Sequence, residues 1–141
     1  MKLGFIFHLY QPSLQKEAVF RKVYAECYSP LVKFLKSHRD FNLSLNIPLS
    51  LLELMDKYGY SDWIDDVKTL SEASRIEILG SAAYHPLLTH LPERLVEEEI
   101  VLNETGLGYY LGSRQDFEGS PASMMRDLSG FFPPELAINE E

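Results

Sequence analysis

Short apolar runs alternate with helical patterns along the whole chain, and this alternation limits the possible folds most. The strand-like runs span 3–7, 41–47 and 75–80, and a fourth begins at 131. The helical patterns, in which apolar residues recur every three or four positions, span 17–37, 50–58, 61–71 and 93–111. Strands that alternate with helices predict an α/β protein with about four parallel strands and right-handed crossovers.

Proline, glycine and serine mark where these elements should break. Pro30 should kink or split the first helix near Tyr28, because proline lacks the backbone N–H that a helix interior needs. Gly59 should end the second helix, and Ser61 should cap the next one with its hydroxyl. Because no linker or internal repeat interrupts the pattern, we expect residues 1–141 to form a single domain.

Charge and composition restrict the partners of the chain. A formal net charge of −8 argues against nucleic acid and anionic membranes, which need a basic surface, and it suits a neutral substrate. No apolar run approaches the ~18 residues of a membrane span, and too few apolar residues follow Met1 for a signal peptide. Cys27 is the one cysteine, which favours a reducing compartment. We therefore expect a cytoplasmic protein, and we expect no cofactor.

Polar or titratable side chains lie at the end of each predicted strand. They are His8 to Gln11, Asn46, Glu77 with the following Tyr84 and His85, and Glu135. The C-terminal ends of parallel strands meet at one edge of a sheet, where α/β enzymes place their sites. Pro133 and Pro134 stiffen the backbone just before Glu135, so that carboxylate is a candidate nucleophile or general acid.

Purely structural roles are open for several of these residues. His8 alone could be a hydrogen-bonded histidine at a strand end, and 84–86 could be a simple turn. Glu77 lies between two isoleucines, so it faces solvent, the helix layer or a barrel interior, and in the interior an unpaired carboxylate is costly. His85 and His90 have the spacing of a possible metal pair. However, the intervening Pro86 opposes a shared helix face and no aspartate or cysteine is near, so we expect no metal site.

Four sequence blocks together resemble a known family. They are His8-Leu9-Tyr10-Gln11-Pro12, Ile76-Glu77-Ile78-Leu79-Gly80, Tyr84-His85-Pro86 and Gly130-Phe131-Phe132-Pro133-Pro134-Glu135. In their order and rough spacing they are similar to glycoside hydrolase family 57, which includes α-amylases, 4-α-glucanotransferases, α-glucan branching enzymes and amylopullulanases. The resemblance implies that the chain is the N-terminal portion of an incomplete (β/α)7 barrel, related to the barrel of polysaccharide deacetylases.

The resemblance also implies roles for single residues. Glu135 matches the catalytic nucleophile of the family, and Glu77 matches an acidic residue on the third strand. His8 and Gln11 match a sugar-binding block on the first strand, and His85 matches a substrate-pocket position. The resemblance therefore implies an α-glucan or oligosaccharide as the ligand.

The chain departs from the family pattern in two ways. Tyr10 stands where the family block has histidine; tyrosine can stack on a sugar or donate a hydrogen bond, but it cannot be a cation at neutral pH. The family's general acid is an aspartate on a later strand, whereas a retaining glycosidase needs both carboxyl groups, ~5–5.5 Å apart. Four strands of a barrel would also leave open edges. We therefore expect completion by the rest of a barrel or by self-association.

Three functional interpretations follow. In the first, the chain is the nucleophile-bearing segment of a retaining α-glucan hydrolase or glucanotransferase and is inactive alone. In the second, it is a non-catalytic carbohydrate-binding or structural remnant of the barrel. In the third and weakest, it is a metal-dependent deacetylase, although it lacks the early paired aspartates of that group.

Overall fold

The computed structural model describes residues 3–112 and 128–139. Its strands are β1 (Ile6–His8), β2 (Leu43–Asn46) and β3 (Ile76–Leu79). Its α-helices are α1 (Glu17–Val23), α2 (Ser29–Ser37), α3 (Leu49–Lys57), α4 (Ser61–Glu72) and α5 (Glu93–Leu111). A π-helical segment (Tyr24–Tyr28) joins α1 to α2, and short 3₁₀ turns lie at Leu88–His90 and Pro134–Leu136.

The three strands form one parallel sheet in the order β1-β2-β3. Phe7 pairs with Leu45, and Leu45 pairs with Ile78, so the strands follow one another in both sequence and space. The predicted α/β class with parallel pairing is confirmed. Strand crossovers through helices produce this order because parallel neighbours need a long connection.

The structure differs from the prediction at the fourth strand. Where a strand was expected from Phe131, the described residues form one isolated parallel bridge between Gly80 and Phe131. The Gly80 N–H donates to the Gly130 carbonyl, and the Phe132 N–H donates back to Gly80, both at 2.8 Å. Pro133 and Pro134 follow at once, and because they carry no N–H the ladder cannot continue.

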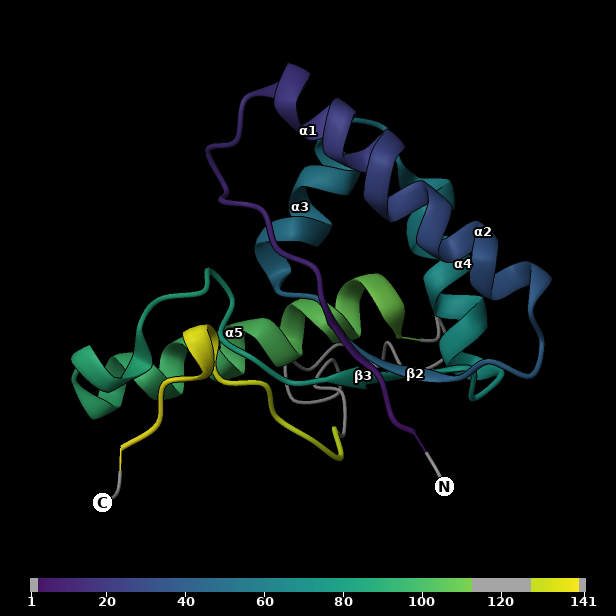
Figure 1. Cartoon of the computed structure of the whole chain (residues 1–141). Helices are drawn as coiled ribbons and strands as arrows, with labels where there is room; N and C mark the ends of the chain where they lie inside the picture. The colour runs from purple at the N-terminus through teal and green to yellow at the C-terminus, as the bar shows by residue number, and fades with distance from the viewer. Residues whose placement is uncertain (1–2, 113–127, 140–141) are drawn as a thin grey trace.

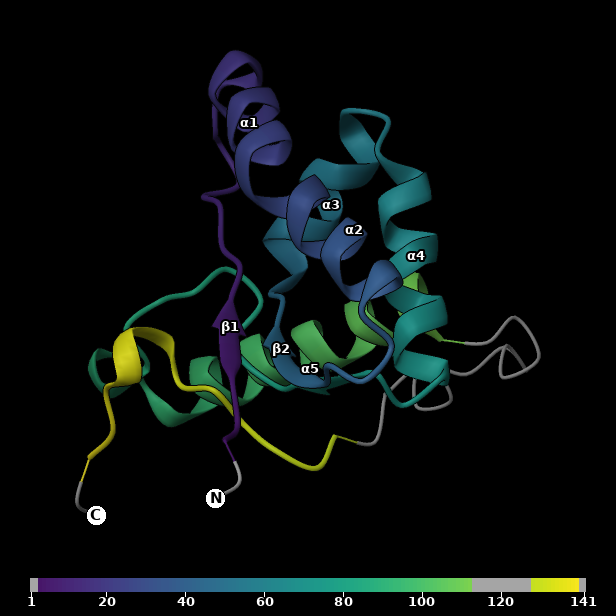
Figure 2. The ribbon, with the colours of Figure 1, turned by 45° about the vertical axis from the view of Figure 1, so that its right-hand side comes forward.

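Alternating side chains divide the sheet into two faces. Leu43, Leu45, Ile76 and Ile78 are buried in the core with residues of α2, α3, α4 and α5, whereas Glu77 between the isoleucines is exposed. Figure 1 shows α1 to α4 gathered on one side of the strands, and Figure 2 shows α5 passing behind β2. In Figure 1 the C-terminal segment, drawn in yellow, runs along the opposite side of the strands from α1 to α4. Glu77 therefore lies on the face away from the buried core.

The predicted breaks in the helices are mostly confirmed. The first helical pattern becomes π-helical at Tyr24–Tyr28, where the Ser29 N–H donates to the Tyr24 carbonyl, and Pro30 then opens α2. Gly59 ends α3 with a left-handed φ of 78°. The capping prediction was wrong: α4 begins at Ser61, but Tyr60 occupies the N-cap position and no side chain caps the helix.

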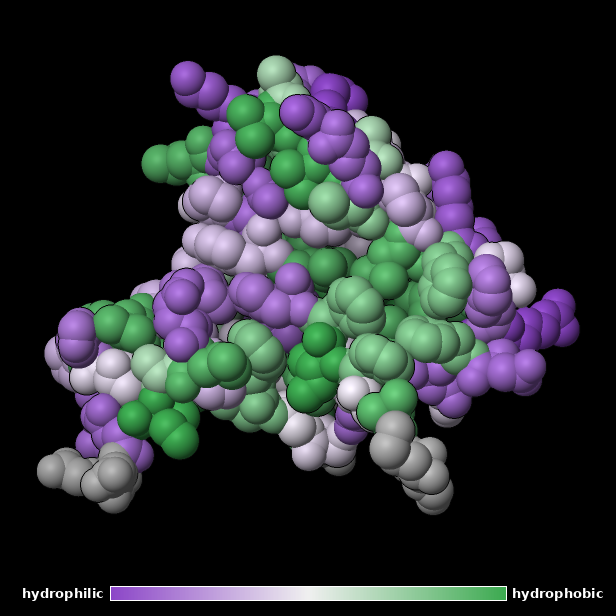
Figure 3. All heavy atoms as spheres, in the orientation of Figure 1, coloured by the Kyte–Doolittle hydropathy of each residue, from purple (hydrophilic) through white to green (hydrophobic). Residues whose placement is uncertain are grey.

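Apolar side chains remain exposed in β1, in the residues just before it, and in the C-terminal segment. Leu3 is 71% exposed and Ile6 60%, while Leu136 and Ile138 are exposed by 68% and 78%. In Figure 3 the apolar surface spreads across the middle of the face that β1 crosses. Among residues 3–112 and 128–139, β1 pairs only with β2, so its outer edge is open. No described helix is both long enough and apolar enough to cross a membrane.

Candidate active site

Four of the predicted site residues meet at the C-terminal end of the sheet: His8, Tyr10, His85 and Glu135. The first three contribute rings to a stack that also contains Phe132, which was not predicted. Ring centroids are separated by 4.9 Å from Phe132 to His8, 4.7 Å from His8 to His85 and 4.5 Å from His85 to Tyr10. Neighbouring planes differ by at most 29°. The stack therefore joins the end of β1, the loop after β3 and the C-terminal segment.

Glu135 meets this stack at His85. The Nε2 atom of His85 lies 3.5 Å from the Oε1 atom of Glu135. The His85 side chain is 4% exposed and the Glu135 side chain 72% exposed, so a buried imidazole is paired with a carboxylate open to solvent. Such a carboxylate can reach a bound molecule without losing its contact to the protein.

Both residues of this pair have left-handed backbone. The φ angle is 58° at His85 and 56° at Glu135, and Leu136 continues at 54°. Residues other than glycine rarely adopt this backbone conformation. His85 also precedes a proline, and a residue in that position normally takes an extended conformation. Backbone strain of this kind is concentrated at functional sites, where the surroundings enforce it.

The loop that carries His85 is anchored through Tyr84. The Tyr84 N–H donates to Glu99 Oε2 on α5 (3.0 Å), and its hydroxyl donates to Glu53 Oε1 on α3 (3.1 Å). The Ala83 carbonyl also accepts from the N–H of Ser50, at the start of α3 (3.0 Å). These contacts explain how a short turn can hold His85 in a strained conformation.

Burial and neighbouring charges shape the protonation of the site. Burial lowers the pKa of His85, the nearby His8 lowers it further, and Glu135 acts in the opposite direction. At neutral pH His85 is therefore uncharged, and the adjacent carboxylate favours the tautomer with its proton on Nε2. Burial, and secondarily the charge of Glu135, raises the pKa of Tyr10, so its hydroxyl stays protonated.

Asn46 joins the site from the end of β2. Its Oδ1 atom lies 2.6 Å from Nδ1 of His8, so with this amide orientation His8 donates from Nδ1. Two buried polar atoms here have no hydrogen-bond partner among the described residues: Nδ2 of Asn46 and Nδ1 of His85. Asn46 was visible in the sequence as a polar strand end, and Phe132 lay inside the block that contains Glu135, but neither was assigned to the site.

Gln11 is placed beside the site rather than in the ring stack. Its Nε2 donates to the Tyr28 hydroxyl (3.1 Å), and its Oε1 accepts from Gln15 (2.8 Å). The Tyr28 hydroxyl in turn donates to the Tyr10 carbonyl (3.1 Å). In this structure Gln11 therefore supports the loop that presents Tyr10.

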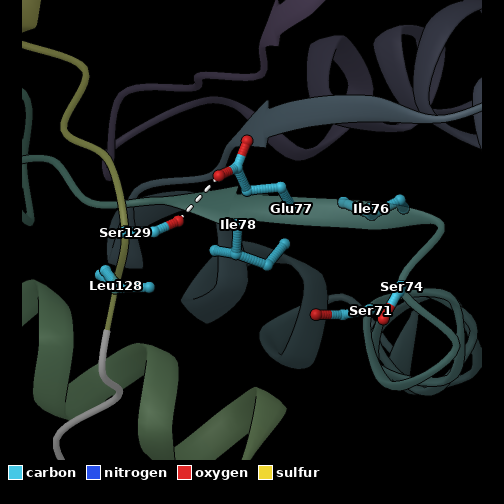
Figure 4. Close-up of a pocket in the computed structure, with 7 residues that line it drawn as sticks. All are labelled: Ser71, Ser74, Ile76, Glu77, Ile78, Leu128 and Ser129. Atoms are coloured by element: carbon cyan, nitrogen blue, oxygen red, sulfur yellow. Dashed lines mark hydrogen bonds between the residues drawn. The ribbon is translucent and has the colours of Figure 1, made fainter.

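Glu77 lies on β3 apart from the ring stack. Its carboxylate accepts hydrogen bonds from Ser44 (2.5 Å) and Ser129 (2.7 Å). It borders a cavity of about 340 Å³ that is also lined by Ser71 and Leu128. Figure 4 shows this cavity, whose lining does not include His8, His85 or Glu135. The structure therefore separates Glu77 from the other predicted site residues.

The histidine pair considered for a metal is also separated. His90 is exposed in the 3₁₀ turn, whereas the His85 side chain is buried in the ring stack. Within the described ranges, no group of three or more histidine, cysteine, aspartate or glutamate side chains is arranged to hold a metal ion.

Sequence comparison decides the family. The model of glycosyl hydrolase family 57 matches residues 5–141. The chain belongs to glycosyl hydrolase family 57. The match includes every residue of the ring stack together with Glu135, so the site lies within the part that defines this membership.

The curated relatives of this family 57 chain are α-glucan enzymes by name. An α-amylase of Pyrococcus horikoshii is 26% identical over 105 residues, which are 73% of this chain and 16% of that protein. A 4-alpha-glucanotransferase of Thermococcus litoralis is 27% identical over 104 residues, again 16% of its length. The chain therefore spans about a sixth of the curated relatives that it matches.

Solved structures of the family share the fold. The crystal structure of 4-alpha-glucanotransferase from Thermococcus litoralis aligns with a TM-score of 0.71 at 21% identity, over 76% of this chain and 17% of that one. The family 57 branching enzyme of Pyrococcus horikoshii aligns with a TM-score of 0.70 at 18% identity, over 94% of this chain and 34% of that one. At these identities the likeness shows the fold.

Proposed function

We propose that this chain carries the nucleophile, Glu135, of a retaining enzyme that acts on α-glucans. The observation that supports this most is the geometry of Glu135. Its carboxylate is 72% exposed, yet a left-handed backbone behind Pro133–Pro134 and a 3.5 Å contact to buried His85 define its position. The family membership and the α-glucan enzymes among the relatives supply the substrate class.

In this proposal Glu135 attacks the anomeric carbon of a bound glucose unit. The bond to the leaving oxygen breaks, a covalent glycosyl–enzyme ester forms, and water or a second sugar hydroxyl then displaces Glu135. Neutral His85 keeps the carboxylate oriented without neutralising it. His8 and Tyr10 face the same end of the sheet and offer ring edges and a hydroxyl to sugar hydroxyl groups.

The general acid is not Glu77 in this scheme. An acid catalyst needs a raised pKa so that it holds its proton at the working pH. Two hydrogen bonds lower the pKa of Glu77: the one from Ser44 has the larger effect, and the one from Ser129 adds to it. This carboxylate is therefore ionised at neutral pH. We therefore propose that a carboxyl group outside residues 1–141 protonates the leaving oxygen.

The test uses the whole protein that carries residues 1–141. It is incubated with a fluorinated maltosyl fluoride, whose glycosyl–enzyme ester is hydrolysed slowly, and the labelled peptide is identified by mass spectrometry. The label should lie on Glu135, and Glu135→Gln should lower maltoheptaose cleavage by about 10³-fold or more. Glu97→Gln, an exposed carboxylate on α5, is the matched control. Retained cleavage in Glu135→Gln, or a label on another residue, would contradict the proposal.

A second candidate function is glucan binding without catalysis, and one observation favours it. Tyr10 stands where the family block has histidine, and its ring stacks on His85 at 4.5 Å, beside the Glu135 contact. If this function is correct, calorimetry with maltoheptaose will show binding that Tyr10→Ala weakens, while the same protein produces neither hydrolysis nor a labelled Glu135. A covalent label on Glu135 would exclude it.

A further inference from the structure

Glu77 connects two segments that are distant in sequence. Ser44 on β2 donates to its Oε2 atom at 2.5 Å, and Ser129 in the C-terminal segment donates to its Oε1 atom at 2.7 Å. In Figure 4 the side chains of Glu77 and Ser129 point toward one another, while Ile78 points to the other side of β3. One carboxylate therefore ties the C-terminal segment to the sheet.

The segment held by Ser129 leads directly to Glu135. Gly130 accepts from the Gly80 N–H, Phe132 donates to the Gly80 carbonyl, and the Ser81 hydroxyl donates to the Phe132 carbonyl, each at 2.8 Å. A Cβ atom built on Gly130 would lie 2.8 Å from Leu79, so the segment crosses the end of β3 closely.

Few backbone contacts hold this crossing in place. Between residues 128–139 and the rest of the described chain the pairing is a single bridge, and Pro133 and Pro134 end it on one side. Beyond the bridge come Pro133 and Pro134, whose rings restrict φ and make the backbone stiff. A shift at Gly130 is therefore transmitted to Glu135. Side-chain hydrogen bonds at the start of this segment therefore contribute more to holding it on β3 than they would if a full ladder of backbone hydrogen bonds were present.

We propose that Glu77 is a positioning residue that fixes the segment 129–132 on β3 through Ser129, and thereby sets the position of Glu135 against His85. Ser44 holds the second carboxylate oxygen and orients Glu77 from the neighbouring strand. The two hydroxyl donors also lower the pKa of Glu77, which keeps it an acceptor at neutral pH. The hydrogen bond between Ser129 and Glu77 does not depend on the proposed function. Its effect on catalysis does rest on the proposed function.

The first test measures amide hydrogen exchange by NMR in the 141-residue chain. Ser129→Ala removes the tie and should speed exchange of the Gly80 and Phe132 amides about tenfold, while β2 amides keep their rates. Ser44→Ala removes only the donor that orients Glu77, so it should speed exchange of the same two amides less than Ser129→Ala does. Ser13→Ala, an exposed serine before α1, is the matched control and should leave both rates unchanged. Unchanged exchange at Gly80 and Phe132 in Ser129→Ala, or equal acceleration throughout the sheet, would overturn the proposal.

The second test reports on the His85–Glu135 contact. In Ser129→Ala and Glu77→Ala the His85 ring titration should move toward that of Glu135→Gln, and Ser129→Thr, which keeps a hydroxyl, should restore the wild-type titration. If the proposed function holds, Ser129→Ala in the whole protein that carries residues 1–141 should lower kcat and leave KM nearly unchanged. If exchange responds as expected but Glu135→Gln remains active, the tie stands and the proposed function fails. If Glu135 is labelled but Ser129→Ala changes nothing, the tie fails alone.

Discussion

Nε2 of His85 lies 3.5 Å from Oε1 of Glu135, and both residues have left-handed backbone, His85 in the loop after β3 and Glu135 in the 3₁₀ turn Pro134–Leu136. A left-handed residue other than glycine costs about 1–2 kcal/mol, so two of them in contact require compensation. The ring stack around His85 and the bridge beside Gly80 supply it. Contacts from several parts of the fold therefore hold His85 and Glu135 together. The charge state of His85 can be measured directly.

The titration of His85 is the first prediction. Because burial and His8 lower its pKa and Glu135 raises it, Glu135→Gln should lower the His85 pKa further. NMR of the ring C–H resonances measures this. A rise in the His85 pKa in Glu135→Gln would mean that the carboxylate does not act on the ring.

Stability should depend on pH through the same residue. The folded-state pKa of His85 is below its ordinary value of 6.5, so the unfolded chain binds its proton first. The contribution of His85 is complete above pH 6.5 and is lost as the pH falls through the folded-state pKa. Glu77, also lowered, adds a second loss below pH 4.5. Urea unfolding between pH 7.5 and 5 should show a decline that is shallower in His85→Asn.

The contact between α3 and α5 provides a packing prediction. A Cβ atom on Gly106 would lie 2.4 Å from Cδ1 of Leu49, which is buried. Alanine favours the helix by about 1 kcal/mol, but overpacking a buried contact costs about 1–3 kcal/mol. We expect Gly106→Ala to lower the free energy of unfolding by up to about 2 kcal/mol, the difference between these two effects. At Gly4 no atom of the described residues, apart from its chain neighbours, lies within 4 Å of an added Cβ atom, so Gly4→Ala should change the free energy of unfolding by less than about 0.5 kcal/mol.

Arg75 closes the other end of the sheet and gives a third stability prediction. Its Nη2 lies within hydrogen-bonding distance of three carbonyls, those of His38 (2.5 Å), Phe41 (2.7 Å) and Leu35 (3.2 Å), while Nε donates to Asn42 (2.9 Å).

Lysine has a single ammonium group and cannot reproduce the several N–H donors of the planar guanidinium group. Urea unfolding should therefore show that Arg75→Lys destabilises the chain by about 1–3 kcal/mol. Arg39→Lys is the exposed control and should stay within about 0.5 kcal/mol of the parent. Equal effects of the two substitutions would mean that the carbonyl contacts of Arg75 carry no net stability.

Local pattern was sufficient for the elements of the fold. The alternation at 41–47 predicted β2, the helical spacing at 93–111 predicted α5, and Gly59 predicted the end of α3. These features depend on contacts between near neighbours in the chain, which the sequence displays directly. The local pattern failed at Phe131. A full strand was expected there, although Pro133 and Pro134 lack the backbone N–H groups that would continue the ladder.

The convergence of His8, Tyr10, His85 and Glu135 at one end of the sheet could be anticipated, because parallel strands bring their ends to one edge. The sequence by itself thus determined the parallel α/β class and the chemical groups at the strand ends. Only the tertiary structure decided that Phe132 completes the ring stack and that Glu77 is tied to Ser129 instead of joining His85. Those choices depend on which side chains meet across loops, and loop paths are set by packing and strain that no local pattern encodes.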